Sequence, residues 1–456
     1  MKIKEPKNQN YAAIVVEIKT LVPLEKCDNV QGAIIMGNQV VVSKDVKVGD
    51  IGLYFPLECA LSKEYLSNNN LYRKPELNAD PKQKGYFEEN GRIRCVRFRG
   101  HKSEGLFMPM LSIDFAFKNA NSYGFNLGDC FDELNEVPIC SKYVVKTNRT
   151  PGQPGSKKTR DTKKYESKLV ENQFRFHQDT SMLYRNLHRI EPNSLISCTY
   201  KLHGTSGISS YVLCKQPITK FDRVKEWLWN MSYKIGNLFR DTRYSFKINN
   251  TKYDYIYSSR KVIKNEELNP NAQHFYNEDI WGIAHNEVKD FLQKGMTFYY
   301  EIVGFLPNGG SIQKDYDYGC EPTKHAVYIY RITSTNVDGK VIEFSAKQVQ
   351  DFCKKNGLNA VPELYYGYAK DLFPYVNSDG DNIIPDENWS EVFLNWIKSK
   401  YNEKDCYMCS NKVVEEGVVI RIENLEFEAY KQKSFAFYQH ESKMLDQNIE
   451  DIESSN

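Results

Sequence analysis

The sequence feature that most restricts the possible structure and chemistry of this chain is a lysine followed by a polar, turn-forming segment. Lys201 comes directly after an apolar, β-branched run at 195–200, and it opens the sequence Lys-Leu-His-Gly-Thr-Ser-Gly over 201–207. The run predicts a strand. Gly204 lacks a Cβ, so the backbone can turn there and approach a bound phosphate or base closely. The segment therefore predicts an amine held at the end of a strand beside a tight turn.

Five further short motifs follow the lysine in a fixed order. They lie at 258–260 (Ser-Ser-Arg), 298–304 (Phe-Tyr-Tyr-Glu-Ile-Val-Gly), 327–332 (Val-Tyr-Ile-Tyr-Arg-Ile), 416–421 (Glu-Gly-Val-Val-Ile-Arg) and 430–433 (Tyr-Lys-Gln-Lys). Together with the lysine segment they resemble motifs I, Ia, III, IIIa, IV and V of the covalent nucleotidyltransferases, the superfamily of polynucleotide ligases and mRNA capping enzymes. Each match alone is weak, but six in the right order indicate this superfamily.

Two features narrow the resemblance. His203 stands two residues after the lysine, where many DNA ligases have aspartate, as it does in RNA ligases of the Lys-x-His-Gly type. A Phe-x-Phe-His-x-Asp-Thr segment at 174–180 precedes the lysine, and its Asp179 is expected to cap a helix that begins near Met182. Over nearly its whole length the chain resembles the RNA ligases of the Deinococcus and Naegleria type, which carry an N-terminal OB domain.

Residues 1–140 agree with that resemblance. Short β-rich runs follow one another with turns between them and no helical period, at 12–18, 33–36, 39–42 and 51–55. This succession predicts a small OB-like β-barrel. Four arginines then share one extended segment, and none of them is expected in a core: Arg92, Arg94, Arg97 and Arg99. They are either a solvated face or a surface that follows a nucleic-acid backbone.

The rest of the chain divides by composition. Residues 141–168 are expected to be a flexible basic linker, because 146–168 holds eight Lys or Arg against two Asp or Glu. Residues 169–445 mix strand-like and helix-like segments, which predicts an α+β domain. The resemblance implies an ATP-grasp-like nucleotidyltransferase fold built on antiparallel sheets. Residues 446–456 form a polar tail.

Two helices are expected inside this second domain. One covers 280–295, with Ile283, Val288, Phe291 and Leu292 directed inward. The other lies in an apparent insertion at 213–250, where apolar residues fall on one helical stripe and basic residues mostly lie elsewhere. Such a stripe usually packs onto its own domain, and the alternative is contact with a membrane or a partner.

The lysine chemistry follows from the resemblance. Lys201 would attack the α-phosphorus of ATP, and Lys431 and Lys433, which share one face of an extended segment, would offset charge on the phosphates. An ordinary lysine has a pKa of about 10.4, so the site must favour the neutral amine. Burial, nearby cations and a metal all lower a lysine pKa.

The remaining site residues are assigned to the nucleotide and the metal. Arg260 would contact ribose or a nucleic-acid phosphate, and Tyr330 would stack on adenine. Glu416 and Glu301 would hold magnesium, which manganese can replace, directly or through water; the resemblance also allows Glu301 to accept the ribose hydroxyl. Tyr200 stands where several relatives have glutamate, which puts the expected adenine contact in doubt. The residues expected to bind the nucleotide are Lys201, His203, Gly204, Thr205, Ser206, Arg260, Glu301, Tyr330, Lys431 and Lys433.

The resemblance implies an ATP-dependent RNA ligase that joins a 5′-phosphate to a 3′-hydroxyl, at nicks with RNA on the 3′-hydroxyl side. A DNA ligase, a GTP-using capping enzyme and a non-catalytic OB-domain protein that binds nucleic acid are the alternatives. The net charge of +2 provides no separate argument for nucleic acid. Eleven cysteines without a repeated spacing and the lack of a long apolar run predict a cytoplasmic protein that does not enter membranes, in the host cytoplasm if the source is viral. We also expect a monomer.

Overall fold

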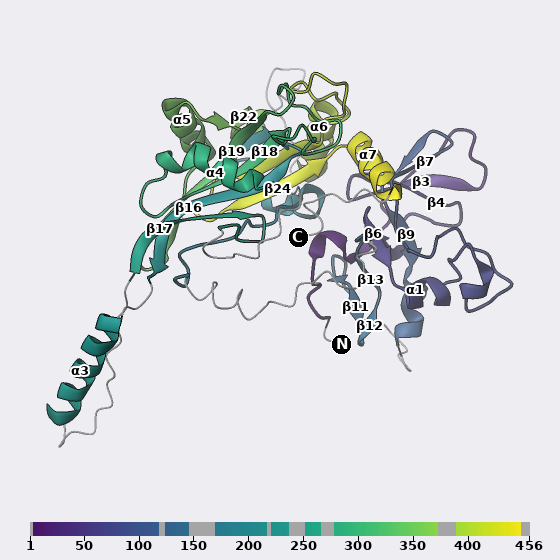
Figure 1. Cartoon of the computed structure of the whole chain (residues 1–456). Helices are drawn as coiled ribbons and strands as arrows, with labels where there is room; N and C mark the ends of the chain where they lie inside the picture. The colour runs from purple at the N-terminus through teal and green to yellow at the C-terminus, as the bar shows by residue number, and fades with distance from the viewer. Residues whose placement is uncertain are drawn as a thin grey trace.

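The computed structural model describes residues 3–117, 124–145, 169–216, 220–236, 251–265, 278–372 and 389–447. The predicted basic linker from residue 146 onward and the predicted tail from residue 448 onward lie outside these ranges. Within them the chain forms an N-terminal β-rich domain and a larger α+β domain (Figure 1).

The N-terminal domain is built from short antiparallel strands. Four of them pair in the order β10-β1-β5-β9, and three more in the order β2-β3-β4. The predicted β-rich runs are confirmed because each coincides with one of these strands. The bounds are β1 Ala13–Glu17, β2 Thr20–Val22, β3 Val30–Ile35, β4 Asn38–Ser43, β5 Ile51–Phe55, β6 Cys59–Leu61, β7 Val96–Phe98, β8 His101–Ser103, β9 Leu106–Pro109, β10 Cys130–Phe131, β11 Glu133–Leu134, β12 Val137–Pro138 and β13 Cys140–Lys142, with the short helix α1 at Lys63–Asn68.

Two sheets form the larger domain. One has six strands in the order β17-β16-β18-β19-β20, with β21 beside β19, and the other has five in the order β14-β24-β23-β15-β22. All neighbours are antiparallel except β14 with β24 and β19 with β21. The bounds are β14 Ser181–Met182, β15 Leu195–Tyr200, β16 Thr205–Lys215, β17 Thr251–Ser259, β18 Met296–Gly304, β19 His325–Thr335, β20 Val341–Glu343, β21 Asn359–Ala360, β22 Glu363–Tyr368, β23 Gly417–Ile422 and β24 Glu428–Lys433.

Helices α4 (Ile280–Val288) and α5 (Ala346–Asn356) pack on the six-stranded sheet, whose central strand β18 is buried at every residue. Helix α5 has clear end signals, with a capping box between Ser345 and Gln348 and Gly357 at φ +67° after its last turn. Helix α4 is shorter than the predicted 280–295, because a 3₁₀ turn at Lys289–Phe291 follows it.

The inward face predicted for α4 is right at two of its positions and wrong at one. Val288 and Leu292 are buried, whereas Ile283 is 36% exposed. The helix gives way to the 3₁₀ turn after Val288, so a stripe drawn on one continuous helix does not describe the whole segment.

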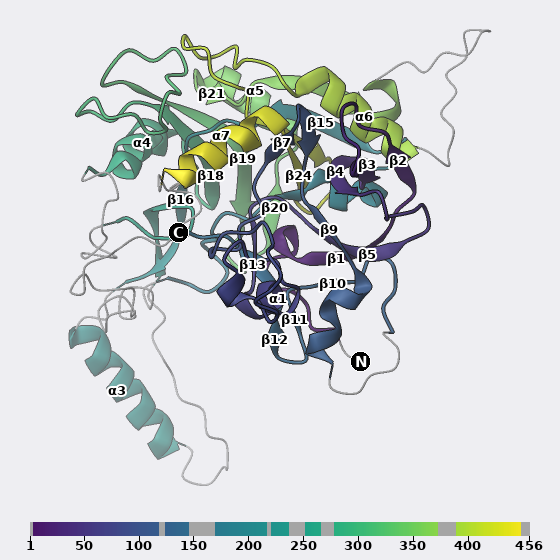
Figure 2. The same ribbon diagram turned by 90° about the vertical axis from the view of Figure 1, so that its right-hand side faces the viewer.

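The two domains share one apolar core. Phe393 and Leu394 of helix α6 (Trp389–Tyr401) belong to the same buried apolar cluster as Ile420 of the five-stranded sheet and Val40 of the N-terminal domain. Helix α7 (Phe435–Asp446) follows β24 directly and lies against the N-terminal domain in both views (Figures 1 and 2). The catalytic candidates on the five-stranded sheet are therefore attached to the N-terminal domain through packed helices.

The stripe in the apparent insertion does not pack as expected. Helix α3 (Lys220–Gly236) stands away from both sheets in Figures 1 and 2. Large apolar side chains along it are at least 46% exposed, namely Phe221, Val224, Trp227, Leu228, Trp229 and Met231. The amphipathic pattern was sufficient to predict the helix, but the packing partner that we expected is not present among the described residues. None of the described helices combines the length and apolar character needed to cross a membrane.

The arginine segment also differs from the prediction. Only Val96–Phe98 of it is a strand, and Arg92 before that strand is 4% exposed. Its guanidinium donates to the Ser442 carbonyl and to Asp446 Oδ1, both at 3.0 Å, and its Nε lies 3.9 Å from Glu58 Oε2. Arg92 is thus neither a solvated nor a phosphate-binding residue, because carboxylates from two domains compensate its burial.

Glu58 generates a prediction about pH. Burial raises its pKa to about 7, although Arg92 opposes the shift. The folded state therefore keeps a proton that the unfolded chain has lost, and stability falls as the pH rises from about 4.5 to about 7. We expect Glu58→Gln to remove this decline, on the order of 3 kcal/mol over that range.

Urea unfolding of the wild type and the variant between pH 4.5 and pH 8 measures the difference. Glu64→Gln, at an exposed position on α1, is the matched control and should leave the wild-type pH dependence in place. A Glu58→Gln variant with the same decline as the wild type would contradict the assignment.

Candidate active site

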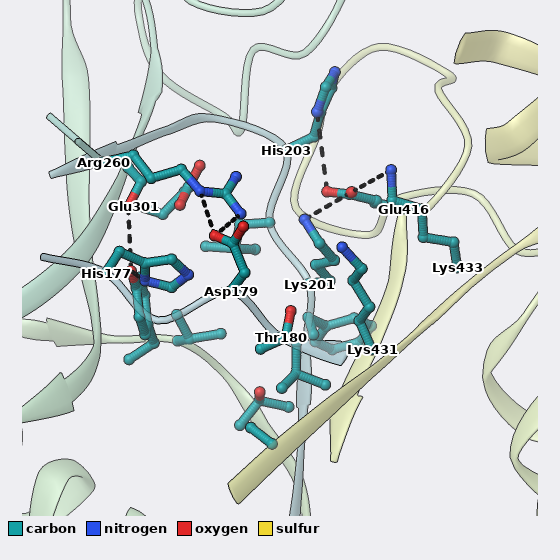
Figure 3. Close-up of a pocket in the computed structure, with 18 of the residues that line it drawn as sticks. His177, Asp179, Thr180, Lys201, His203, Arg260, Glu301, Glu416, Lys431 and Lys433 are labelled. Carbon is teal, nitrogen blue, oxygen red and sulfur yellow. Dashed lines mark hydrogen bonds and ion pairs between the residues drawn. The ribbon is translucent and has the colours of Figure 1, made fainter. Parts of the chain in front are cut away.

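A cavity of about 700 Å³ lies between the two sheets of the larger domain and is closed on one side by the N-terminal domain. The six-stranded sheet contributes Ser206, Glu301 and Tyr330 to its wall. The five-stranded sheet and its edges contribute Lys201, His203, Glu416, Lys431 and Lys433, and the N-terminal domain contributes Asn10, Tyr11, Glu58, Lys142 and Tyr143. Figure 3 shows the charged side chains directed toward one another across this space.

Lys201 is held at the end of β15 by its backbone and its side chain. Its N–H donates to the Gly417 carbonyl at 2.9 Å, which continues the pairing of β15 with β23. Its Nζ lies 2.7 Å from Glu416 Oε1. Gly204 is required a few residues later, since a Cβ there would lie 2.3 Å from the Ile302 carbonyl oxygen. The predicted strand, lysine and close turn are all present.

His203 is held on the same turn. Its backbone N–H donates to Tyr318 Oη at 2.6 Å, and its Nδ1 lies 3.9 Å from Glu416 Oε2. The imidazole ring packs edge-on against Tyr316 and Phe437. Aromatic packing and the strand-end turn fix the ring beside the carboxylate.

Glu416 is the buried anion of the site. It precedes β23 directly, and the register Gly417↔Lys433 brings it next to the last residue of β24. Its side chain is 2% exposed, and Lys433 Nζ lies 3.4 Å from the Oε1 atom that also faces Lys201. Burial alone would raise its pKa, but Lys201, Lys433 and His203 outweigh that effect and hold the pKa below the ordinary value.

Lys431 and Lys433 both line the cavity, as their alternation on β24 predicts. Burial, followed by the charges of Lys433, Lys201 and Arg260, lowers the pKa of Lys431 to about 7. Lys433 has the opposite shift: burial opposes its charge, but Glu441 and Glu416 raise its pKa. The pKa values of the two neighbouring lysines thus shift in opposite directions, because Lys433 has two carboxylates within ion-pair distance and Lys431 is affected mainly by burial and neighbouring cations.

The expected helix cap at Asp179 is wrong. A short strand and a 3₁₀ turn follow it in place of an α-helix, and its carboxylate pairs with Arg260, with Oδ1 2.6 Å from Nη2 and 3.0 Å from Nε. This fork orients the guanidinium at the cavity edge. Nearby, Tyr330 Oη lies 2.8 Å from His177 Nδ1 and 3.2 Å from Ser206 Oγ.

Two of the predicted site residues do not line the cavity. Thr205 is buried within β16, opposite Ile302 of β18, and Gly204 serves the turn through its backbone, whose carbonyl accepts from Gln313 Nε2 at 2.8 Å. The remaining predicted residues are brought together around one space. Sequence reasoning missed Asp179 as the partner of Arg260, and it missed Gln313 and Glu441; no spacing rule connects Glu441, on a helix, with a lysine on the preceding strand.

A divalent cation can be accommodated at Glu416. Among the described residues, no three His, Cys, Asp or Glu side chains are grouped so that they hold a metal alone. Magnesium usually takes one or two carboxylates together with substrate phosphates and water. Lys201 and Lys433 both pair with Oε1 of Glu416. The other oxygen, Oε2, is buried and accepts no hydrogen bond in the described part of the chain, and His203 Nδ1 lies 3.9 Å from it. In Figure 3 Glu301 lies beside Arg260 and Asp179, and Glu416 lies beside Lys201 and His203.

Comparison with known proteins defines the fold. A family model described as an OB-fold domain matches residues 12–110. No curated protein matches the chain by sequence. The described chain joins an N-terminal OB-fold domain to an α+β domain on antiparallel sheets, and over nearly its whole length this fold is similar to solved structures of an RNA ligase, so the predicted fold is confirmed.

The particular structures to which the chain is similar are those of the RNA ligase of Naegleria gruberi. The form with pyrophosphate has a TM-score of 0.55 at 16% identity, covering 96% of this chain and 99% of that chain. A variant with ATP and manganese has a TM-score of 0.54 at 17% identity, covering 94% and 98%. A variant with AMP and manganese has a TM-score of 0.53 at 16% identity, with the same coverage.

The neighbouring glutamates Glu415 and Glu416 generate a prediction. Both are buried, but burial and the adjacent Cys406 raise the pKa of Glu415 to about 9, so it is neutral at pH 7, whereas Glu416 is ionised. Glutamine resembles a protonated carboxyl in shape and charge. We therefore expect Glu416→Gln to cost about 3–5 kcal/mol, because it leaves buried ammonium groups without their anion. Glu415→Gln should cost less than about 1 kcal/mol.

Urea unfolding at pH 7 compares the two variants, which serve as controls for each other because they are adjacent and equally buried. Equal losses of stability, or a larger loss at Glu415, would show that the charge of Glu416 does not organise the site.

Proposed function

We propose that the protein is an ATP-dependent RNA ligase that joins a 5′-phosphate to a 3′-hydroxyl through a covalent lysine–AMP intermediate. The observation that carries the proposal is the arrangement of Lys201, 2.7 Å from Glu416, with Lys431 and Lys433 on the adjoining strand of the same cavity. A nucleophilic amine, a buried carboxylate and further lysines that face the phosphates suit displacement at a phosphoanhydride. The fold shared with an RNA ligase solved with ATP, AMP and pyrophosphate supports the same reaction.

The reaction has three displacements in this proposal. Lys201 Nζ bonds to the α-phosphorus of ATP, pyrophosphate leaves with the electrons of the broken P–O bond, and the amine loses a proton. AMP then passes to the 5′-phosphate of the nucleic acid, which releases the lysine. Finally a 3′-hydroxyl attacks that phosphate and AMP leaves, so that one ATP is converted to AMP and pyrophosphate for each bond formed.

The residues of the chain divide these tasks. Lys431 and Lys433 contact the phosphates, and Arg260, oriented by Asp179, binds ribose or a nucleic-acid phosphate. Tyr330 stacks on adenine, and Glu301 accepts the ribose hydroxyl; Ser206 and His203 complete the wall. Magnesium or manganese held at Glu416 neutralises phosphate charge and favours the neutral form of the lysine.

We propose that the N-terminal domain binds the nucleic-acid substrate. Residues 1–140 are the proposed nucleic-acid-binding unit, and strand β13 extends this domain to Lys142; residues 169–445 are the proposed nucleotidyltransferase unit, whose cavity the N-terminal domain closes on one side. Lys142 and Tyr143, which line the cavity from the N-terminal side, place a cation and an aromatic ring where a strand end would enter. We propose nicked duplexes with RNA on the 3′-hydroxyl side as substrate.

The first test is covalent labelling. Protein stripped of any bound AMP with pyrophosphate is incubated with α-labelled ATP and magnesium, then denatured and run on a gel. We expect label on the wild type and none on Lys201→Ala, because no other group takes over the nucleophilic amine. Lys215→Ala, an exposed lysine at the far end of β16, is the matched control and should be labelled as the wild type is.

Each alternative gives its own result in this assay. Label from GTP and not ATP would indicate a capping enzyme, and no label on the wild type would favour a non-catalytic nucleic-acid-binding protein. Nicked duplexes that differ only in RNA or DNA at the 3′-hydroxyl end then separate an RNA ligase from a DNA ligase, since an RNA ligase should seal the RNA-ended nick faster.

Lys431 generates a prediction about proton uptake. With a pKa of about 7 it is mostly neutral at pH 8, and a bound triphosphate raises that pKa. Binding of an ATP analogue with a methylene group between the α- and β-phosphorus should therefore take up about one proton at pH 8 and much less at pH 6. Calorimetry in two buffers of different ionisation enthalpy counts these protons, and Lys431→Met should abolish the uptake. Equal uptake by the variant would show that another group titrates.

A further inference from the structure

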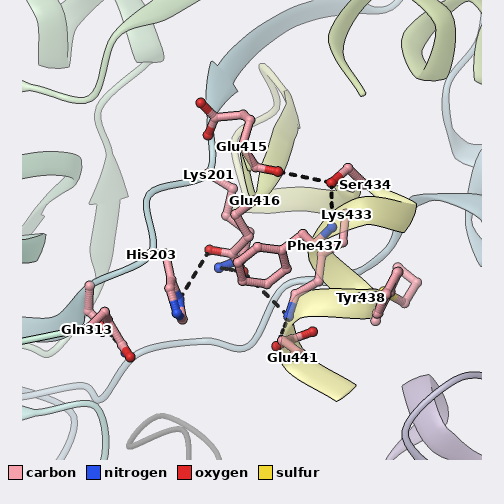
Figure 4. Close-up of polar contacts among 12 residues, drawn as sticks. Lys201, His203, Gln313, Glu415, Glu416, Lys433, Ser434, Phe437, Tyr438 and Glu441 are labelled. Atoms are coloured by element: carbon pink, nitrogen blue, oxygen red, sulfur yellow. Dashed lines mark hydrogen bonds and ion pairs between the residues drawn. The ribbon is translucent and has the colours of Figure 1, made fainter. Parts of the chain in front are cut away.

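Lys433 lies between two carboxylates from different elements. Its Nζ is 2.6 Å from Glu441 Oε1 and 3.4 Å from Glu416 Oε1 (Figure 4). Glu441 lies on α7, which begins after Ser434 and turns back over the end of β24. The shorter contact is thus with a residue that belongs to none of the motifs that define the candidate site.

A neighbouring face of α7 contacts the N-terminal domain. Ser442, the residue after Glu441, donates through Oγ to Glu58 Oε1 at 2.9 Å and accepts from the Cys95 N–H at 3.3 Å. Its carbonyl accepts from the buried Arg92, and Phe435 at the start of the helix is part of the N-terminal core. Adjacent residues of one helix therefore contact the lysine of one domain and the buried polar groups of the other.

The charge of Glu441 affects which cations pair with the Glu416 carboxylate. Oε1 of Glu416 already has Lys201 at 2.7 Å, and Lys433 at 3.4 Å is beyond a close charge-assisted hydrogen bond. If Glu441 lost its charge, Glu416 would be the remaining carboxylate within ion-pair distance of Lys433 among the described residues. The ammonium group would then move toward Glu416 and compete there with Lys201 and with a divalent cation.

We propose that Glu441 is a positioning residue for the adenylylation step, which holds the Lys433 ammonium group away from Glu416 and makes its position depend on the docking of the N-terminal domain. The inference rests on the proposed function and adds to it. It assigns to α7 a role in the chemistry that none of the sequence motifs contains.

The test compares Glu441→Gln and Glu441→Asp with the wild type in single-turnover labelling by α-labelled ATP. We expect Glu441→Gln to lower the maximal labelling rate tenfold or more with little change in the ATP concentration for half-maximal rate. The magnesium concentration for half-maximal rate should rise severalfold, since Lys433 then competes at Glu416. Glu441→Asp should recover part of the rate. Glu391→Gln, at an exposed position on α6, is the control.

A double-mutant comparison separates positioning from a merely structural role. In a Lys433→Gln background, Glu441→Gln should produce no further loss of rate, because the residue acts through the lysine. A full additional loss in that background, or a wild-type rate for Glu441→Gln alone, would overturn the proposal. Failure of the wild type to be labelled would instead overturn the proposed function, and this role with it.

Ser442→Ala tests the dependence on docking. This variant removes the hydroxyl bonded to Glu58 and leaves Glu441 and Lys433 in place. We expect a severalfold lower labelling rate and a shift of the magnesium dependence in the same direction as for Glu441→Gln. Labelling at the wild-type rate and magnesium dependence would overturn the link between domain docking and Lys433. Binding of the methylene ATP analogue, measured by calorimetry for each variant, shows independently of turnover that the cavity remains formed.

Discussion

The buried ion pair between Glu416 and Lys201 is the interaction on which the site depends. A carboxylate that is 2% exposed is tolerated only when cations compensate it, and here strand ends from one sheet supply them. Lys201 directly follows β15, Glu416 precedes β23 and Lys433 ends β24, so the antiparallel register of three adjacent strands brings the three charges to one edge. Any shift of register would separate the anion from its cations, so charge compensation and strand pairing reinforce each other.

The two sheets have different tasks. The five-stranded sheet provides the charges, and the six-stranded sheet provides hydroxyls and an aromatic ring through Ser206 and Tyr330, together with the carboxylate of Glu301. Strand β18, buried along its whole length, is the rigid base for that second wall. The cavity thus combines a concentration of charged groups from one sheet with a polar and aromatic wall from the other.

The N-terminal domain is part of this arrangement and not an appendage to it. It shares an apolar core with the five-stranded sheet through α6, and its buried Arg92 and Glu58 contact α7 beside the catalytic candidates. When buried polar groups pair across two domains, separating the partners lowers stability strongly because each group is left buried without compensation. Such pairs therefore favour one docked geometry over alternatives. The cavity wall that the N-terminal domain contributes therefore has a fixed orientation relative to the two sheets.

Local sequence determined the parts of this protein that depend on local physics. The apolar run before Lys201, the turn at Gly204 and the alternation of Lys431 with Lys433 predicted a strand, a close backbone approach and a shared face, and the structure has all three. The strands predicted from the β-rich runs of the N-terminal domain are also present. The predictions that were wrong concerned residues whose partners lie elsewhere in the chain. Arg92 is buried because Asp446 and Glu58 pair with it, and Asp179 pairs with Arg260 instead of capping a helix.

The pairing of Glu441 with Lys433 has no local signature either, because it joins a helix to the strand before it across the end of a sheet. Helix α3 is a second example of a tertiary arrangement that the local sequence did not predict. Its amphipathic pattern predicted the helix but not the exposure of its apolar face. The sequence alone thus identified side chains that the structure gathers around one cavity, because their spacing follows strand geometry. The tertiary structure alone decided which charges are compensated, because burial and ion pairing depend on which elements pack together, whether the partners are close in the chain, as Lys433 and Glu441 are, or distant, as Arg92 and Asp446 are.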